Sequence, residues 1–187
     1  MSVGLRVRRI SLSLLFAGAM TGLGPHGQGL RAASIKDPVR VNFACASGEV
    51  FAAADIQEAV REIVPPHGGA GSRVWGDRAV ALDLNHDRRP EYLVPLSCGA
   101  TCNCRWAIIA LKPSRSLGVI EGCVLDLSVA RRGWAQVTAY THLSAGEGTL
   151  TTHDYRSGEY VKNSEVGLKP EVVESFERCK DNESCCP

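Results

Sequence analysis

Oxygen-bearing side chains occupy alternate positions in one short segment, residues 83–91, which we call the acidic loop. Asp83, Asn85 and Asp87 are spaced two residues apart, and Glu91 follows a pair of arginines and a proline. Calcium in proteins takes about six to eight hard oxygen ligands, and a tight loop with this spacing can turn such side chains inward. The segment therefore predicts a calcium site with these ligands: Asp83, Asn85, Asp87, the carbonyl of Arg89, and Glu91.

The same residues carry a resemblance to a known kind of loop. The run Asp-Leu-Asn-x-Asp-x-x-Pro-Glu-Tyr, which begins at Asp83, resembles the FG-GAP or VCBS-type calcium loops of secreted and surface proteins. A longer stretch, residues 80–161, resembles a group of small exported bacterial proteins of no established function. The shared segments are a Cys-Gly…Cys-x-Trp segment (Cys98-Gly99 and Cys104-Arg105-Trp106) and a Gly-Trp strand before a Ser-Ala-x-Glu-Gly-Thr-Leu turn (Gly133-Trp134 and Ser144 to Leu150). The resemblance implies an exported protein with a calcium loop.

The acidic loop departs from that family at two positions. His86 and Arg88 stand where the family has glycines, and a left-handed backbone there costs a residue with a Cβ about 1 kcal/mol or more. Arg88 and Arg89 also place positive charge beside the predicted cation. The alternative is a hairpin turn in which Asp and Asn side chains accept hydrogen bonds from loop amides.

The chain contains eight cysteines, all beyond its N-terminal apolar segment. In an exported chain an even number of cysteines predicts up to four disulfides. The adjacent Cys185 and Cys186 are expected to bond to different partners, with Cys179 and Cys45 among the candidates. The cluster of Cys98, Cys102 and Cys104, with Cys123, leaves a thiolate zinc site open as an alternative.

The N-terminal segment has the pattern of an export signal. Arg6, Arg8 and Arg9 precede an apolar run over residues 10–20, which is short for a membrane span. We predict a signal peptide over residues 1–24, a flexible leader over 25–36, and one disulfide-rich domain over 37–187; a retained membrane anchor is the alternative. Residues 1–24 contain three of the chain's 21 basic residues and none of its 20 acidic ones, so the remainder is slightly acidic. That balance argues against a nucleic-acid-binding protein, which needs a positive surface.

The predicted fold is α+β. An apolar stripe with helical spacing predicts a helix over residues 54–64, and Lys169-Pro170 opens a second helix that ends near Cys179. Between them, short apolar runs predict strands near residues 78–82, 92–97, 105–111, 118–127, 134–141, 149–155 and 159–161, and another precedes the first helix at 39–43. We expect a single antiparallel sheet of about six or seven short strands, with one helix at each end, stapled by disulfides.

The sequence contains no Gly-x-Ser-x-Gly elbow, no phosphate-binding glycine loop and no His-Glu-x-x-His motif, so it predicts no catalytic residue. The leading interpretation is an exported, non-enzymatic binding module in the periplasm or outside the cell. Its partner would be a protein or a glycan; nucleic-acid binding and membrane insertion after signal cleavage are not expected. Trp75 could contribute to a glycan platform, whereas Trp106 and Trp134 are expected to pack against the sheet. The alternative is a secreted hydrolase or enzyme inhibitor whose site lies where His142 and His153 meet across a hairpin.

Overall fold

The computed structural model describes residues 33–34, 38–52, 54–63, 77–129, 133–180 and 182–186. The predicted signal peptide, most of the predicted leader, and Trp75 lie outside the described residues. Ala33 and Ser34, at the end of the predicted leader, pair with a strand of the domain.

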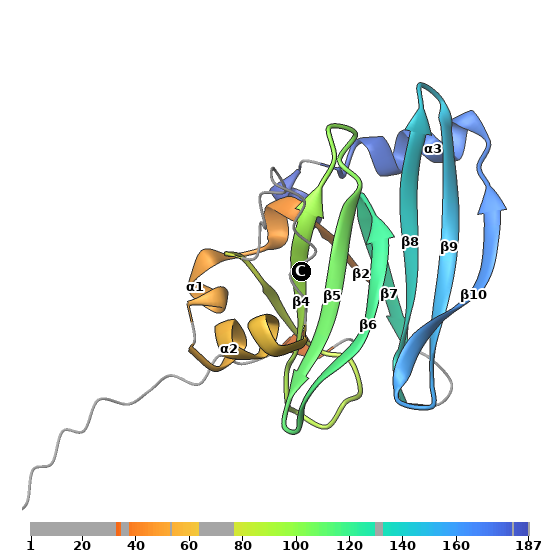
Figure 1. The fold of residues 1–187 in the computed structure, drawn as a ribbon. Coiled ribbons are helices and arrows are strands. Elements are labelled where there is room, and N and C mark those ends of the chain that lie inside the picture. The colour runs from red at the N-terminus through yellow and green to blue at the C-terminus, as the bar shows by residue number, and fades with distance from the viewer. Residues whose placement is uncertain are drawn as a thin grey trace, which may run out of the picture.

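Two five-stranded sheets form the domain, so the expectation of a single sheet is wrong (Figure 1). The first sheet has the order β1-β3-β4-β5-β6, with bounds β1 Ala33–Ser34, β3 Val80–Asp83, β4 Glu91–Cys98, β5 Cys104–Leu111 and β6 Ser114–Gly122. The second has the order β10-β9-β8-β7-β2, with bounds β10 Glu159–Gly167, β9 Glu147–Arg156, β8 Ala135–Ser144, β7 Val124–Val129 and β2 Val39–Asn42. Neighbouring strands are antiparallel except β1 and β3, which run parallel.

The predicted strand at residues 118–127 is in fact two strands, because the chain turns from one sheet to the other at Gly122 and Cys123. The amide of Cys123 donates a hydrogen bond to the Tyr140 carbonyl at 2.7 Å. A Cβ on Gly122 would lie only 3.0 Å from the Cβ of Ala139. The close approach of these strands therefore requires glycine at this corner.

The main core lies between the sheets and buries the inner faces of strands β4 and β5. Inward-facing side chains of both sheets pack there around Trp106, which is 0% exposed. The indole Nε1–H of Trp106 donates to the Gly122 carbonyl at 3.0 Å. Because their outer faces are covered as well, these strands read as continuous apolar runs rather than alternating ones.

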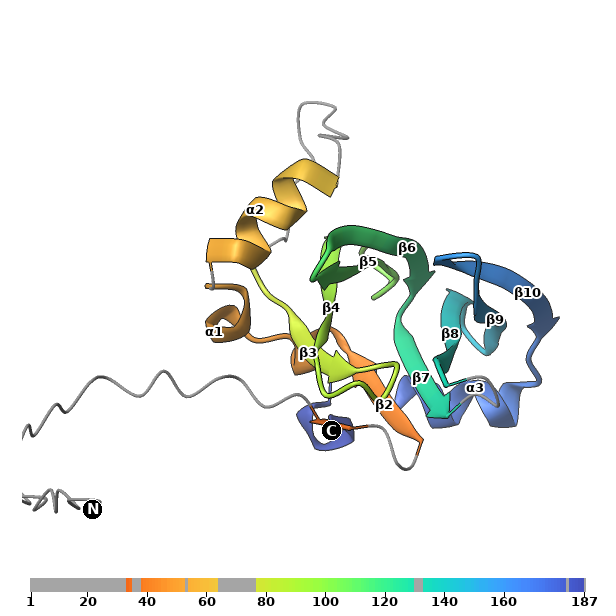
Figure 2. The same cartoon turned by 90° about the horizontal axis from the view of Figure 1, so that it is seen from below.

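Helices cover the outer face of each sheet (Figure 2). Helix α2 (Ala54–Ile63), which confirms the predicted helix, buries Ile56, Ala59 and Val60 at helical spacing against the first sheet. The short helix α1 (Gly48–Phe51) precedes it. Helix α3 (Pro170–Glu177), the second predicted helix, packs Val173 and Phe176 against the second sheet.

The eight cysteines, all within the described residues, form four disulfides: Cys45–Cys186, Cys98–Cys104, Cys102–Cys123 and Cys179–Cys185. The prediction of four bridges is confirmed, and so are the different partners of Cys185 and Cys186. Since the predicted zinc thiolates are all oxidised, the zinc alternative does not hold. The 3₁₀ helix η1 (Phe43–Cys45) ends with Cys45. The 3₁₀ helix η2 (Glu183–Cys185) ends with Cys185 and directly precedes Cys186.

Candidate functional site

The acidic loop connects β3 to β4 and is built from side chains that accept hydrogen bonds from loop amides. Asn85 Oδ1 accepts from the Asp87 amide at 2.9 Å, and Asp87 Oδ1 accepts from the Arg89 amide at 2.7 Å. Both bonds span two residues, which is the geometry of an Asx turn. Asp83 Oδ2 accepts from the Arg88 amide at 3.0 Å. The hydrogen-bonding pattern of the turn alternative is therefore present in the structure.

Two residues of the acidic loop have left-handed backbones, and they are the two positions where glycine was expected from the resemblance to calcium loops. His86 has a φ of 61° and Arg88 a φ of 67°. Only glycine adopts this region without steric cost, and each residue with a Cβ costs about 1–2 kcal/mol. The loop thus has the backbone course that glycine favours while carrying larger side chains.

Two carboxylates of the acidic loop are buried. Asp83 is 2% exposed and Glu91 is 3% exposed. Glu91 Oε2 accepts from the Leu84 amide at 2.8 Å. Burial raises the pKa of the Glu91 carboxyl to about 7; the Leu84 amide partly offsets this, and the charges of Asp87 and Asp83 add to it.

One oxygen of this buried pair lacks a partner. Asp83 Oδ1 is buried and accepts no hydrogen bond from the residues that the structure describes. A buried carboxylate oxygen without a donor is costly unless a cation or a water meets it. Within the described part of the chain, however, no group of three or more His, Cys, Asp or Glu side chains is arranged to hold a metal ion.

A cleft of about 380 Å³ lies beside the acidic loop; we call it the loop cleft. Its walls come from the acidic loop, Asp55 of α2, the turn between β5 and β6, and Trp134. The ring of Trp134 stacks on Tyr155 with centroids 3.8 Å apart, and the Tyr155 hydroxyl accepts from Arg115 at 2.9 Å. Of the five predicted calcium ligands, all but Asp83 line this cleft.

The tryptophans otherwise follow the prediction. Trp106 is buried in the core between the sheets, and Trp134 is half-buried against the same core. Trp134 also lines the loop cleft, so this one residue both packs against the core and forms part of the cleft wall.

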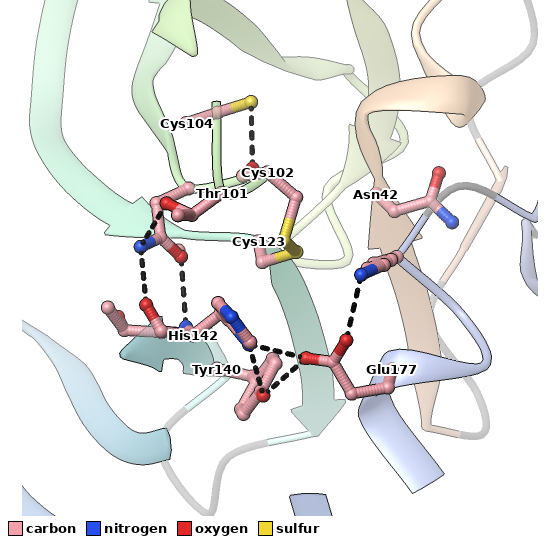
Figure 3. Close-up of a disulfide and its surroundings, with 12 residues drawn as sticks. Asn42, Thr101, Cys102, Cys104, Cys123, Tyr140, His142 and Glu177 are labelled. Carbon is pink, nitrogen blue, oxygen red and sulfur yellow. Dashed lines mark hydrogen bonds and ion pairs between the residues drawn. A yellow bond between two sulfur atoms is a disulfide. The ribbon is translucent and has the colours of Figure 1, made fainter. Parts of the chain in front are cut away.

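A second cavity, of about 390 Å³, lies at the opposite end of β4 and β5; we call it the disulfide pocket. It is lined by Phe43, Lys180, His142 and the loop 98–104. Two of its lining residues, His142 and Lys180, interact with the carboxylate of Glu177 in α3. Glu177 Oε1 lies 2.7 Å from His142 Nδ1 and accepts from the Tyr140 hydroxyl at 2.7 Å, while Oε2 accepts from Lys180 at 2.9 Å (Figure 3).

Glu177 is therefore a carboxylate with three donors from two parts of the chain: two from strand β8 and one from the segment after α3. Burial raises the pKa of its carboxyl, but the hydrogen bonds from Lys180, Tyr140 and His142 outweigh that effect and lower the pKa below its ordinary value. Sequence reasoning did not single out Glu177, because it lies 35 residues from His142 on a different element. Glu177 is the last residue of an amphipathic helix and lies three residues before Lys180, a position typical of a surface residue.

The expected meeting of His142 and His153 does not occur. In the register of β8 and β9, His142 faces Gly148 whereas His153 faces Val137. The five residue steps from Val137 to His142 span roughly 17 Å, and their odd number places the two rings on opposite faces of the sheet. His153 is buried, and burial lowers the pKa of its imidazole.

The chain was also compared with known proteins. No family model matches it, and no match was found among the curated proteins or the solved structures. Among the described helices, none is long and apolar enough to cross a membrane.

Proposed function

We propose that the protein is an exported binding module and that the loop cleft takes up a glycan. The observation that carries the proposal is the combination of a preformed cavity with one indole wall and several charged and amide side chains that converge on it. Four disulfides support export, because such bridges form and persist in oxidising compartments.

The chemistry of the cleft suits sugars. An aromatic face packs against the apolar side of a sugar ring, while Asp55, Asn85 and the arginines can hydrogen-bond to its hydroxyl groups. The stacking of Trp134 on Tyr155 holds the indole in place. A rigid aromatic side chain loses little conformational entropy when a ligand binds.

The acidic loop is proposed to hold a calcium ion that orders this edge of the cleft. The buried, unpartnered oxygen of Asp83 and the neighbouring buried carboxyl of Glu91 support the proposal, and so do the left-handed residues at 86 and 88. The turn hydrogen bonds do not compete with a metal, since a carboxylate oxygen has lone pairs for both an amide and a cation.

A glycan-array screen of the purified protein tests the proposal. Saturable binding should be weakened about tenfold by the double substitution R89A/K112A, which removes two charged walls of the cleft. Arg105→Ala removes an exposed arginine of β5 that lies outside the cleft and should leave binding unchanged. The absence of any glycan bound, or equal effects of both variants, contradicts the glycan assignment. Capture of a protein partner that R89A/K112A abolishes would replace the glycan with a protein.

Calcium is tested separately by thermal unfolding with millimolar calcium or with chelator. Calcium at ten times its dissociation constant should stabilise the protein by about 1.4 kcal/mol. Asp83→Asn, which keeps the shape of the side chain, should abolish the shift. An unchanged melting temperature at millimolar calcium refutes the metal site, as does an equal shift in Asp83→Asn.

A further inference from the structure

We propose that the disulfide pocket is a second binding site and that its ligand is a small organic acid, a carboxylate attached to an apolar body. The site is independent of the loop cleft. The two cavities lie at opposite ends of β4 and β5, which are eight residues long each and therefore separate them by roughly 25 Å.

The hydrogen-bond donors of the pocket point to an anion. Its lining contains Lys180 and includes no carboxylate among the described residues; Glu177, which pairs with Lys180, lies outside the lining. Thr101 adds an exposed hydroxyl that can donate a hydrogen bond. An ammonium group has three donors, so Lys180 can donate to Glu177 and to a carboxylate ligand together, beside the Thr101 hydroxyl.

Glu177 lies behind this lining and positions it. Through its contacts with His142 and Lys180 it fixes one nitrogen of the imidazole and the ammonium group. The Tyr140 hydroxyl donates to the same Glu177 carboxylate and also helps to hold it in place. Side chains that are already held in place lose less entropy when a ligand binds.

The remaining lining is apolar. Phe43 and the Cys98–Cys104 disulfide contribute a ring and a pair of sulfur atoms to the cavity. The ring of Phe43 also lies 5.5 Å from the Arg78 guanidinium, measured to the ring centroid. A cavity with basic groups and apolar groups fits a ligand that has an acid group and a hydrophobic part.

Two of the four disulfides have cysteines in the lining of the pocket. Cys98–Cys104 closes the lining loop, and Cys102–Cys123 ties that loop to the corner between the sheets. The other two lie next to lining residues in the sequence: Cys179, bonded to Cys185, precedes Lys180, and Cys45, bonded to Cys186, lies two residues after Phe43.

A side-chain clamp adds to these covalent links. The Asn103 amide donates to the His142 carbonyl at 2.8 Å, and its oxygen accepts from the His142 amide at 2.9 Å. The loop and β8 are thereby held in one fixed relation. The Cys45–Cys186 bridge ties the tail to the segment after β2, whereas Cys98–Cys104 and Cys102–Cys123 hold the lining loop itself, as a preorganised site requires.

Titration of the intact protein with sodium benzoate, followed by amide NMR, tests the site. Saturable shifts are expected at loop 98–104 and at His142. Benzamide, the neutral analogue of the same shape, should bind at least tenfold more weakly. Displacement of benzoate by inorganic phosphate would show that the anionic oxygens are recognised in their own right.

Charge-matched variants complete the test. Lys180→Met should weaken benzoate binding about tenfold, whereas Arg178→Met, which removes an exposed cation two residues away, should change it less than twofold. Thr101→Val provides a second lining variant on another segment, with an expected loss of about threefold. The proposal is overturned if benzamide binds as well as benzoate, if phosphate binds but benzoate does not, or if Arg178→Met and Lys180→Met act alike.

Discussion

Glu91 shows how a single buried carboxyl ties the stability of the protein to pH. Its side chain lies under the acidic loop, where burial raises its pKa and the neighbouring Asp87 and Asp83 charges disfavour its ionisation further. A calcium ion at the proposed site would act on this group in the direction opposite to a proton. A bound cation would favour the ionised carboxylate, whereas burial in the metal-free loop favours the protonated form.

The contribution of Glu91 to the stability of the metal-free protein should fall as the pH rises from about 4.5 to 7. In the unfolded chain the Glu91 carboxyl has a pKa of 4.5, and in the folded chain about 7. The folded state therefore binds more protons than the unfolded chain between pH 4.5 and 7. The contribution of Glu91 to the free energy of unfolding is largest below pH 4.5. Glu91→Gln should reduce this slope in chelator, as measured by urea unfolding at several pH values. An unchanged slope would show that Glu91 is not the titrating group.

Gly148 is a residue-scale constraint on the second sheet. A Cβ at this position would overlap Cε2 of Tyr140, whose ring is buried and stacks on Phe176 with centroids 4.8 Å apart. We expect Gly148→Ala to destabilise the protein by about 1–3 kcal/mol, as overpacking does. Gly167→Ala is the matched control, because no atom lies within 4 Å of its added methyl group. Equal denaturation midpoints for the two variants would contradict this account.

At the scale of elements, the acidic loop combines side-chain turns with strained backbone positions. Arg88 has a left-handed backbone, whereas its neighbour Arg89 does not, and both side chains are exposed. Arg88→Gly should therefore relieve strain, while Arg89→Gly adds only freedom to the unfolded chain. We expect the first variant to be more stable than the second by about 1 kcal/mol in chemical unfolding. The reverse order would show that the loop relaxes without cost.

Helices were easier to predict than sheets, for a physical reason. The stripe of Ile56, Ala59 and Val60 defines the buried face of α2 within little more than one helical turn, so the local sequence is enough to predict this helix. The assignment of a strand to a sheet depends on distant partners. Residues 118–127 look like one apolar run, and nothing local shows that Gly122 is the corner where β6 ends in one sheet and β7 begins the other.

The sites divide in the same way. The acidic loop is a contiguous motif, and the turn hydrogen bonds of Asn85 and Asp87 follow from residue type and spacing. The contacts of Glu177 could not be predicted, because they depend on how α3 packs across the second sheet. His142 was singled out, but the register of β8 and β9 separates it from His153 and leaves Glu177 as its partner.

For the whole molecule, the disulfides should differ widely in their effect on stability. Cys45–Cys186 closes a loop of 141 residues and Cys98–Cys104 one of six. By loop-closure entropy, removal of the first should cost about 5 kcal/mol and of the second about 2 kcal/mol. Paired serine variants, C45S/C186S and C98S/C104S, compared by guanidinium unfolding, measure the difference. A larger loss from the short loop would indicate that strain or packing dominates.

The bridge between Cys45 and Cys186 also sets an order of events. Strand β2 lies at the edge of the second sheet, and the Asn42 amide donates to the carbonyls of Cys179 and Asn182. A chain synthesised from its N-terminus has Cys45 available long before Cys186. Cys45, which follows the edge strand, therefore cannot form its disulfide with Cys186 until almost all of the domain has been synthesised. The native pairing of Cys45 is therefore open to competition from every cysteine that is synthesised before Cys186.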